Sequence, residues 1–408
     1  MMEHRARVLV LQTREDAERE IGGLGLQEPA LQWLAAKSRV VAVRLEHVTG
    51  RAAALLKQEC LAVGCDCVVA PQVASFDDTP RPVIVLATPR QYARLLERLP
   101  GQAMGLAVLG DALRAVLAAY EGCRRPRWTC RGREAGTDRG TVVVGIINVT
   151  SDSFSGDGLG GDLEAAVEQG RTFAEAGAAV LDVGAESTRP GSLPVSIEEQ
   201  IAKVVPVVRA LAEQTDALVS VDTQFSEVAR AGLEAGAAIV NDVSGLRGEG
   251  MVETVAEHGA GAVIMHMLGE PRTMQAHPRY KDLMTEVYDF LCRRVEAALQ
   301  AGVAEDALAV DPGFGFGKTV QHNLELLRRL REMHSLGRPV LIGTSRKSTI
   351  GKVLDRPAGE RVLGTAATCA VAIAHGAHAI RVHDVSDMVQ VARMTDAILD
   401  GWDSDAAD

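Results

Sequence analysis

Short hydrophobic runs alternate with longer amphipathic stretches along most of the chain beyond residue 140. The runs are rich in β-branched residues and lack polar alternation, which is typical of strands buried on both faces of a parallel sheet. The stretches between them have the period of a helix, and Gly177 and Gly236 stand where a left-handed C-cap would end two of them. Eight strands are predicted, at Val142–Ile147, Ala179–Val183, Leu218–Val221, Ala238–Asn241, Ala262–Met265, Ala307–Val310, Val340–Gly343 and Ala379–Val382, with helices such as Leu163–Ala176, Ile197–Leu211, Ser226–Ala235 and His322–Leu330 between them.

Eight strand-then-helix units in succession predict an α/β fold, a (β/α)8 TIM barrel, over residues 124–408. A doubly wound open sheet is the alternative, but the even spacing of the eight units favours closure. Residues 1–123 predict a separate small α/β domain, in which no group of residues indicates a catalytic site. Its predicted strands are Val8–Gln12, Val40–Leu45 and Val83–Ala87, and its predicted helices are Leu31–Ala36, Ala52–Ala62, Arg90–Leu99 and Gly110–Tyr120.

An arginine-rich segment, residues 121–140, joins the two predicted domains. It has two interpretations: a basic patch for nucleic acid, or a linker that leads into a hairpin whose first arm is Trp128 to Arg133 and whose second arm runs from Gly140 onward. The chain as a whole has a net charge of -11, whereas a general nucleic-acid binder needs a basic face. The linker is therefore the favoured interpretation, and no nucleic-acid partner is expected.

The composition of the chain limits the class of protein and the cellular compartment that we expect for it. The chain has 408 residues, of which 47% are hydrophobic, enough for two sizeable cores. Its seven cysteines include no CxxC pair, so structural thiols in a reducing cytoplasm are predicted. The N-terminus is too short and too charged for a signal peptide, and no apolar run reaches membrane-spanning length. A cytoplasmic protein without a membrane partner is the expectation.

Every predicted barrel strand ends in a polar or ionisable residue. In a barrel, the carboxyl ends of all strands converge on one mouth, where active sites are built. One such residue would be an ordinary turn, but the recurrence at all eight strands predicts a site. These residues are Asn148, Asp182 with Glu186, Asp222, Asn241 with Asp242, His266, Asp311, Ser345-Arg346-Lys347, and Arg381 with His383.

Three motifs suggest other chemistry, and each fails on either position or residue type. The GxGxxG pattern at residues 156–161 does not directly follow a strand, as a dinucleotide fold requires, so a loop over the mouth is favoured. The stretch Pro312–Thr319 resembles a phosphate-binding P-loop but has proline where that pattern needs glycine. His375 and His378 have a spacing that metal ligands use, but they precede the last strand, at the opposite end from the mouth.

The ordered strand ends resemble the dihydropteroate synthase family. The resemblance spans roughly Trp128 to Ala397; each motif is modest alone, but the ordered set is specific. The first domain lies outside it, although some bacterial and archaeal members carry such an extension. The motifs are residues 148–154 (NVTSDSF), 186–191 (ESTRPG), 220–223 (SVDT), 241–243 (NDV), 265–267 (MHM), 311–318 (DPGFGFGK), 345–348 (SRKS) and 381–384 (RVHD).

The resemblance implies a transferase of folate biosynthesis. Such an enzyme condenses 6-hydroxymethyl-7,8-dihydropterin pyrophosphate with p-aminobenzoate, releases pyrophosphate, and uses Mg²⁺. A homodimer formed through barrel helices is also implied. By resemblance, Asp222, Asn241, Met265, Asp311 and Lys347 bind the pterin; Asn148, Arg381 and His383 bind the pyrophosphate, with Asn148 also a metal ligand; Phe154, Thr188, Arg189, Pro190, Phe316 and Ser345 bind p-aminobenzoate; and Asp311, Lys347, Arg381, His383 and Asn148 are catalytic.

Several points depart from or qualify this resemblance. Ser151 replaces the usual proline of the first loop, and the loop acid is shifted by one position to Asp157, so that its equivalence stays open. We expect Ser345 to cap a helix that runs through Lys347, with the helix N-terminus facing the aminobenzoate carboxylate. A pterin-binding methyltransferase that uses methyltetrahydrofolate is one rival, and a non-catalytic pterin-binding protein is another. Neither needs the cationic motifs around Arg189, Lys347 and Arg381, which favour the synthase.

Overall fold

The computed structural model describes residues 7–11, 13–75, 77–149, 159–186, 195–269 and 273–401, with the backbone alone for 159–162. The chain divides into two compact units, Met1–Ala118 and Ala119–Asp408. The division falls after Ala118, inside helix α5 (Leu106–Gly122), whereas the predicted domain boundary follows residue 123, just beyond the end of that helix. None of the described helices is long and apolar enough to cross a membrane.

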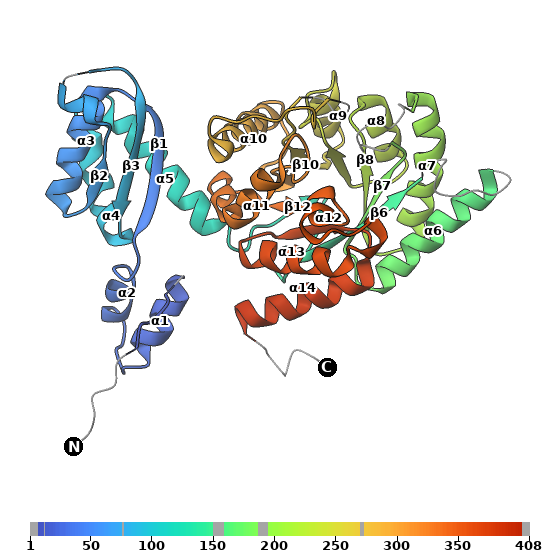
Figure 1. The fold of residues 1–408 in the computed structure, drawn as a ribbon, viewed down its shortest axis with the longest axis horizontal. Helices are drawn as coiled ribbons and strands as arrows, with labels where there is room; N and C mark the ends of the chain where they lie inside the picture. Colours follow the sequence, from blue (N-terminus) through green and yellow to red (C-terminus); the bar gives the residue numbers. More distant parts are fainter. Residues whose placement is uncertain are drawn as a thin grey trace. The chain divides into compact units, whose positions relative to one another are not determined.

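The first unit is a three-stranded antiparallel sheet with helices packed on one face. The strand order is β1-β3-β2, and one side of every strand is buried with apolar residues of α3, α4 and α5 (Figure 1). Leu56, Leu95 and Leu113 are fully buried there, one from each of these helices. The elements are α1 (Arg14–Gly22), α2 (Ala30–Ala35), β1 (Val41–Val48), α3 (Gly50–Val63), β2 (Asp66–Val68), β3 (Arg81–Ala87) and α4 (Pro89–Arg98), with 3-10 turns at Pro71–Ser75 and Leu99–Gly101.

Two of the three strands predicted for this unit are confirmed, as β1 and β3, and all four predicted helices are present. The strand predicted at Val8–Gln12 is wrong over its described residues 8–11, which pair with no strand; Val8 is 91% exposed. The sheet takes β2 as its third strand instead. That segment is only three residues long, too short to show an alternating pattern.

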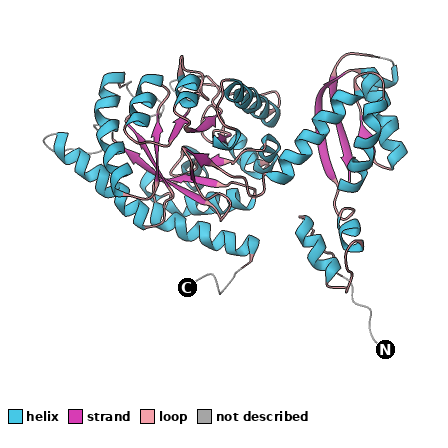
Figure 2. Cartoon of the chain, turned by 180° about the vertical axis from the view of Figure 1, so that it is seen from behind, coloured by secondary structure: helices cyan, strands magenta, loops and turns pink. Residues whose placement is uncertain are grey.

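The second unit confirms the predicted TIM barrel. Eight parallel strands form one sheet in the order β11-β10-β9-β8-β7-β6-β13-β12, and a bridge between Val310 and Val340 connects its two edges. The strands lie at the centre with helices around them (Figure 2). The strands are β6 (Val142–Asn148), β7 (Val180–Gly184), β8 (Leu218–Asp222), β9 (Ile239–Asp242), β10 (Gly261–Met265), β11 (Leu308–Asp311), β12 (Leu341–Ile342) and β13 (Ala379–Val382).

The helices that surround this sheet bury apolar faces against it in one large core. Each predicted barrel helix is present, with ends shifted by a few residues at most. They are α6 (Leu159–Glu175), α7 (Ile197–Gln214), α8 (Ser226–Glu234), α9 (Met251–Glu257), α10 (Leu283–Gln300), α11 (Val320–Arg328), α12 (Ser348–Leu354), α13 (Val362–Ala374) and α14 (Val385–Asp400), with 3-10 turns at Glu305–Ala307, Leu330–Leu336 and Ala358–Glu360.

A small hairpin closes the N-terminal end of the barrel. Its strands are β4 (Thr129–Cys130) and β5 (Arg133–Glu134), and Trp128 and Cys130 are buried among the first inward-facing residues of the barrel strands. The indole N–H of Trp128 donates to the carbonyl of Ala307 at 3.2 Å. A Cβ on Gly261 would lie 2.3 Å from the Cys130 sulfur, so this glycine makes room for the hairpin. A hairpin is present in the arginine-rich segment, but its second arm is β5 and not the predicted chain from Gly140 onward, which forms the barrel strand β6. The open end of the barrel is its C-terminal mouth.

Candidate active site

Four inward-facing side chains from four strands are joined at the mouth. Arg381 of β13 donates from Nε to Asp182 Oδ2 and from Nη2 to Asp222 Oδ2, both at 2.6 Å. Asn241 of β9 donates from Nδ2 to the same Asp182 oxygen at 2.9 Å. Because these residues come from β7, β8, β9 and β13, closure of the barrel is what brings them together. The network places Asp222, Asn241 and Arg381 in one site, as predicted.

Burial sets the electrostatics of this network. Desolvation raises the pKa of Asp222 to about 7; the Arg381 charge opposes that rise, and the nearby carboxylate of Asp182 adds to it. For Arg381, burial lowers the pKa, but the two carboxylates outweigh it and hold the pKa above its ordinary value. Arg381 therefore stays charged, whereas Asp222 changes its charge near neutral pH.

Asp311 and Lys347 form a second group on the adjoining side of the mouth. Asp311 ends β11 and accepts the backbone N–H of Gly313 at 2.7 Å. Burial raises its pKa, against the opposing charge of Lys347. Burial also lowers the pKa of Lys347 to about 8. The Lys347 ammonium donates to the carbonyl of Phe314 and lies 4.4 Å from the centre of the Phe316 ring.

An apolar wall adjoins these charges. Met265, Met267, Met274 and Val243 are buried together, and Phe316 packs against them half-buried. Thioether and aromatic side chains provide a polarisable surface suited to a flat ring. Charged and amide groups beside such a surface suit a flat heterocycle with a polar edge.

The glycine-rich loop after β11 is fixed by a buried lysine. Lys318 is 2% exposed and donates to Nδ1 of His266 at 2.9 Å and to the carbonyl of Phe316 at 3.2 Å. Burial lowers its pKa to about 7. Gly313 has φ +73°, and a Cβ there would lie 1.8 Å from the carbonyl oxygen of His266. Lys318 thus points into the protein and orders the loop that carries Phe316, which agrees with the rejection of the P-loop interpretation.

The predicted cap on α12 is wrong. The helix begins at Ser348 with Lys347 as its N-cap residue, because Arg346 has φ +57° and turns the chain out of helical geometry. Ser345 instead contacts His383 through its hydroxyl, at 3.0 Å from Nδ1 and 3.2 Å from the backbone N–H. Arg346 forms a two-point ion pair with Asp384. Ser345 is therefore placed beside His383.

Other predicted residues are only partly located. Asn148 ends β6 half-buried, opposite Gly184 of β7. Phe154, Thr188, Arg189 and Pro190 lie outside the described residues, as do Ser151 and Asp157. The motifs assigned no role to Asp182, His266 or Lys318. The position of Asp182 and His266 at strand ends was the available signal, whereas nothing in the sequence marked Lys318 as buried.

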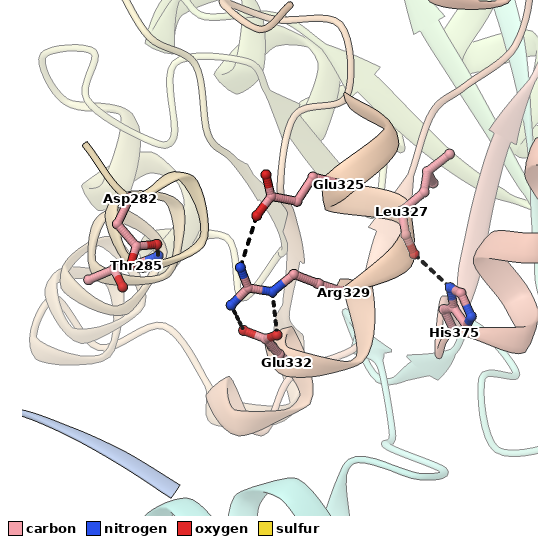
Figure 3. A network of polar contacts seen from close by, with 7 residues as sticks. All are labelled: Asp282, Thr285, Glu325, Leu327, Arg329, Glu332 and His375. Atoms are coloured by element: carbon pink, nitrogen blue, oxygen red, sulfur yellow. Dashed lines mark hydrogen bonds and ion pairs between the residues drawn. The ribbon is translucent and has the colours of Figure 1, made fainter. Parts of the chain in front are cut away.

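The histidines before the last strand are structural. His375 bonds through Nδ1 to the carbonyl of Leu327 at 2.8 Å, beside the surface ion pairs of Arg329 (Figure 3). His378 accepts the Val340 N–H at Nδ1 and donates from Nε2 to the Cys123 carbonyl. Cys123, His334 and His378 lie close enough to surround an ion, but both ring nitrogens of His378 already have backbone partners. The metal interpretation of this pair is therefore not favoured.

Comparisons with known proteins agree with this geometry. The pterin binding enzyme family matches residues 144–383. The chain is 45% identical over 257 residues to dihydropteroate synthase of Escherichia coli strain K12, covering 63% of this chain and 91% of that one. The chain belongs to the dihydropteroate synthase family. It is a transferase that condenses a pterin pyrophosphate with p-aminobenzoate to form dihydropteroate. The two alternative interpretations, a methyltransferase and a non-catalytic pterin-binding protein, are therefore not favoured.

Solved structures of this family overlap the barrel unit. A Yersinia pestis dihydropteroate synthase with a sulfonamide drug has TM-score 0.64 and 41% identity, covering 67% of this chain and 99% of that one. A Xanthomonas albilineans enzyme with 4-aminobenzoic acid has TM-score 0.63 and 42% identity, covering 67% and 98%. A probable bifunctional folylpolyglutamate synthase/dihydropteroate synthase of Halobacterium salinarum is 39% identical over 370 residues, covering 90% of this chain and 44% of that protein. That alignment is longer than the barrel, so relatives of this kind also share much of the first unit.

Proposed function

We propose that the dihydropteroate synthase reaction takes place in the network at the barrel mouth. The single observation that carries this proposal is the joined set of Asp182, Asp222, Asn241 and Arg381, which places acceptors, an amide and a fixed cation within one buried site. A pterin ring presents N–H donors and acceptors along one edge. Buried carboxylates and amides recognise such an edge with high selectivity, because a ligand that lacks a donor leaves a buried group unpaired.

The pterin subsite consists of Asp222, Asn241, Asp311, Lys347 and Met265. The carboxylates accept from ring N–H and amino groups, and the ammonium of Lys347 donates to a ring acceptor. Met265 lies in the apolar wall, against which the flat face of the ring packs. The pKa of Asp222, about 7, means that binding strengthens as pH rises through neutrality, since the ionised form accepts best.

The diphosphate subsite consists of Arg381, His383 and Asn148. A guanidinium is suited to two-point contact with phosphate oxygens. We propose Mg²⁺ at the same place with the Asn148 side chain as a ligand. The fit rests on the partly exposed amide side chain of Asn148 at the end of β6, since an amide oxygen is a ligand that a hard cation accepts. When bound, Mg²⁺ supplies further neutralisation of the leaving group.

Catalysis then requires little covalent participation by the protein. The bond between the pterin methylene carbon and the diphosphate oxygen breaks, and its electron pair leaves with the diphosphate. Arg381 and His383 hold the charge that develops there. The amine of p-aminobenzoate attacks the electron-poor methylene carbon, and the proton that it loses passes to solvent water. Phe316 and Ser345 are proposed to bind p-aminobenzoate, and the family resemblance assigns the same role to Phe154, Thr188, Arg189 and Pro190, which lie outside the described residues.

A homodimer is proposed from the surface of α13. This helix is apolar nearly all round, and its outer side carries Leu363, Ala367 and Val371 at a four-residue spacing; Leu363 is 81% exposed. A helix of that kind is normally covered on every side. We expect Leu363→Glu to convert a dimer into a monomer in light scattering at micromolar concentration, with exposed Met394→Glu of α14 as the control. A wild-type monomer would contradict this.

Two experiments address activity and compartment. Purified protein with 6-hydroxymethyl-7,8-dihydropterin pyrophosphate, p-aminobenzoate and Mg²⁺ should release pyrophosphate and form dihydropteroate. Omission of p-aminobenzoate, or its replacement by methyltetrahydrofolate, should abolish dihydropteroate formation. Absence of product from the complete mixture would refute the proposed function.

We also propose a cytoplasmic location, because all seven thiols are free and six are buried. Fractionation of cells that express the tagged chain tests this location.

A further inference from the structure

Asp182 is an almost fully buried charged group of the mouth, and none of the subsites above uses it. Its side chain on β7 is 1% exposed. One oxygen, Oδ2, accepts from both Asn241 and Arg381. The other oxygen, and the neighbouring hydroxyl of Ser220, are buried without a hydrogen-bond partner among the described residues. A half-paired buried carboxylate costs stability, so packing alone does not account for Asp182.

We propose that Asp182 is a positioning residue that couples the pterin subsite to the diphosphate subsite, an inference that rests on the function proposed above. The geometric basis is that a single carboxylate oxygen holds one residue from each subsite. Asn241 belongs to the pterin side and Arg381 to the diphosphate side, at 2.9 and 2.6 Å respectively. A movement of Asn241 or of Arg381 therefore shifts the Asp182 carboxylate, which in turn shifts the other residue.

On the pterin side, Asp182 fixes which way the amide of Asn241 faces. An ionised carboxylate only accepts hydrogen bonds, so the Asn241 nitrogen must be the atom turned toward it. The amide oxygen is then left to accept from a ligand amino group. Without a charged acceptor on β7, the two orientations of the amide would be closer in energy, and half of the recognition pattern would be lost.

On the diphosphate side, Asp182 keeps Arg381 in place while its other contact changes. Arg381 also donates to Asp222, which the pterin needs as an acceptor. When a pterin N–H donates a hydrogen bond to Asp222, it replaces the bond from the Arg381 guanidinium. The terminal nitrogens of the guanidinium can then bind another ligand, whereas Nε still donates to Asp182. The freed nitrogens then bind diphosphate oxygens. Pterin and pyrophosphate should consequently bind with positive cooperativity, because each favours the same arrangement of Arg381.

The test uses the full chain, with 6-hydroxymethyl-7,8-dihydropterin and inorganic pyrophosphate plus Mg²⁺ as probes in calorimetry, singly and together. Asp182→Asn keeps the shape of the side chain and one acceptor oxygen for Asn241 and Arg381, but removes the charge that holds them. The matched control is Asp242→Asn, a fully buried carboxylate on β9 that, among the described residues, accepts only from its own turn, at Ser244 and Leu246. Ser220→Ala is a second control, since its hydroxyl has no partner in the described part of the chain.

In the wild type, we expect each probe to lower the dissociation constant of the other at least threefold. In Asp182→Asn this cooperativity should vanish and pyrophosphate affinity in the presence of pterin should fall tenfold or more. The kcat/KM for the pterin pyrophosphate should fall while the KM for p-aminobenzoate is unchanged, and both controls should keep wild-type coupling. A purely structural role would lower the melting temperature without this split.

Three results would overturn the inference: independent binding of the two probes to the wild type, unchanged cooperativity in Asp182→Asn, or an equal loss in Asp242→Asn. The first needs no variant, so the inference is testable even if Asp182→Asn fails to fold. The failure of the proposed function itself is distinct, because then the wild type would form no dihydropteroate. An active wild type with an unaffected Asp182→Asn enzyme refutes only the coupling role.

Discussion

Replacement of Arg381 by methionine should reveal that the proposed catalytic cation also stabilises the barrel. The guanidinium contacts two carboxylates at 2.6 Å, and the Asp182 side chain is 1% and the Asp222 side chain 16% exposed. Methionine fills similar volume without charge, so both carboxylates lose their counter-ion. Removal of one partner from a buried ion pair typically costs about 3–5 kcal/mol, and we expect a loss of unfolding free energy in that range.

The pH dependence of this loss follows from Asp222. With Arg381 present its pKa is about 7, and without that charge the folded pKa must be higher. Above pH 7 the folded variant therefore keeps a proton that the folded wild type has released. The difference in stability between the two should grow with pH there, by about 1.4 kcal/mol for each pH unit until the variant also ionises. Between pH 6 and pH 8.5 the gap should widen by up to about 2 kcal/mol.

The assay is urea denaturation followed by the fluorescence of Trp128, the buried indole of the barrel hairpin, in a background with Trp33 and Trp402 replaced by phenylalanine. Arg346→Met is the matched control. Its partner is Asp384, its own side chain is 42% exposed, and loss of such a pair costs below about 1 kcal/mol. If the two variants lose equal stability, or if the Arg381 variant shows no change between pH 6 and 8.5, the electrostatic reasoning fails.

Two further predictions concern the pterin subsite and acid stability. Asp311→Asn should weaken binding of 6-hydroxymethyl-7,8-dihydropterin by about 2–3 kcal/mol in calorimetry, since an amide donor replaces a charged acceptor, and unchanged affinity would remove Asp311 from the site. Burial lowers the pKa of His378 to about 3 from 6.5, so the unfolded chain takes up the proton first and stability falls as pH drops from 6.5 toward 3. In urea denaturation, the wild type should lose about 2 kcal/mol more unfolding free energy between pH 7 and pH 5 than His378→Gln, in which the other buried titratable groups are unchanged, and an equal change in both proteins would contradict the burial argument.

The sequence was sufficient for the barrel and for the identity of the mouth residues. Parallel strands bury both faces, so each appears as an apolar run, and each polar residue that ends a run marks the same edge of the sheet. Asp222, Asn241, Asp311 and Arg381 were located in this way. Their bonding was not predictable, because the contact between Arg381 and Asp182 joins residues 199 positions apart and depends on barrel closure.

The errors have local physical causes. The cap assigned to Ser345 assumed a helix through Lys347, but a positive φ at Arg346 delays the helix start, and arginine gives no sequence signal for that conformation. The strand assigned to Val8–Gln12 relied on β-branched residues without regard to a pairing partner. Lys318 escaped notice because a lysine is normally exposed, and its bonds to His266 and to the carbonyl of Phe316 explain its burial.

The division of the chain yields a last prediction about fragments. A fragment of residues 124–408, the predicted second domain, lacks contacts that belong to the barrel unit. The carbonyl of Cys123 accepts from Nε2 of the buried His378 at 2.7 Å, and its thiol donates to the carbonyl of Arg338. The ring of Tyr120 lies 6.1 Å from that of His334. Loss of the first contact alone leaves a buried donor unpaired, at a cost of about 1–3 kcal/mol.

A fragment of residues 119–408 keeps all of these groups and should match the full chain in pyrophosphate release, because every proposed site residue lies within it. The fragment that starts at Arg124 should be less stable by at least the cost of that unpaired donor, in urea denaturation at pH 7.5. The control is the full chain with Cys123→Ala, which removes the thiol but keeps the carbonyl. Its unfolding free energy should lie between that of the fragment of residues 119–408 and that of the fragment that starts at Arg124. If residues 119–408 are insoluble or inactive while the full chain works, the first unit takes part in the function of the barrel. If both fragments are equally stable, the contacts of Cys123 do not carry the energy assigned to them.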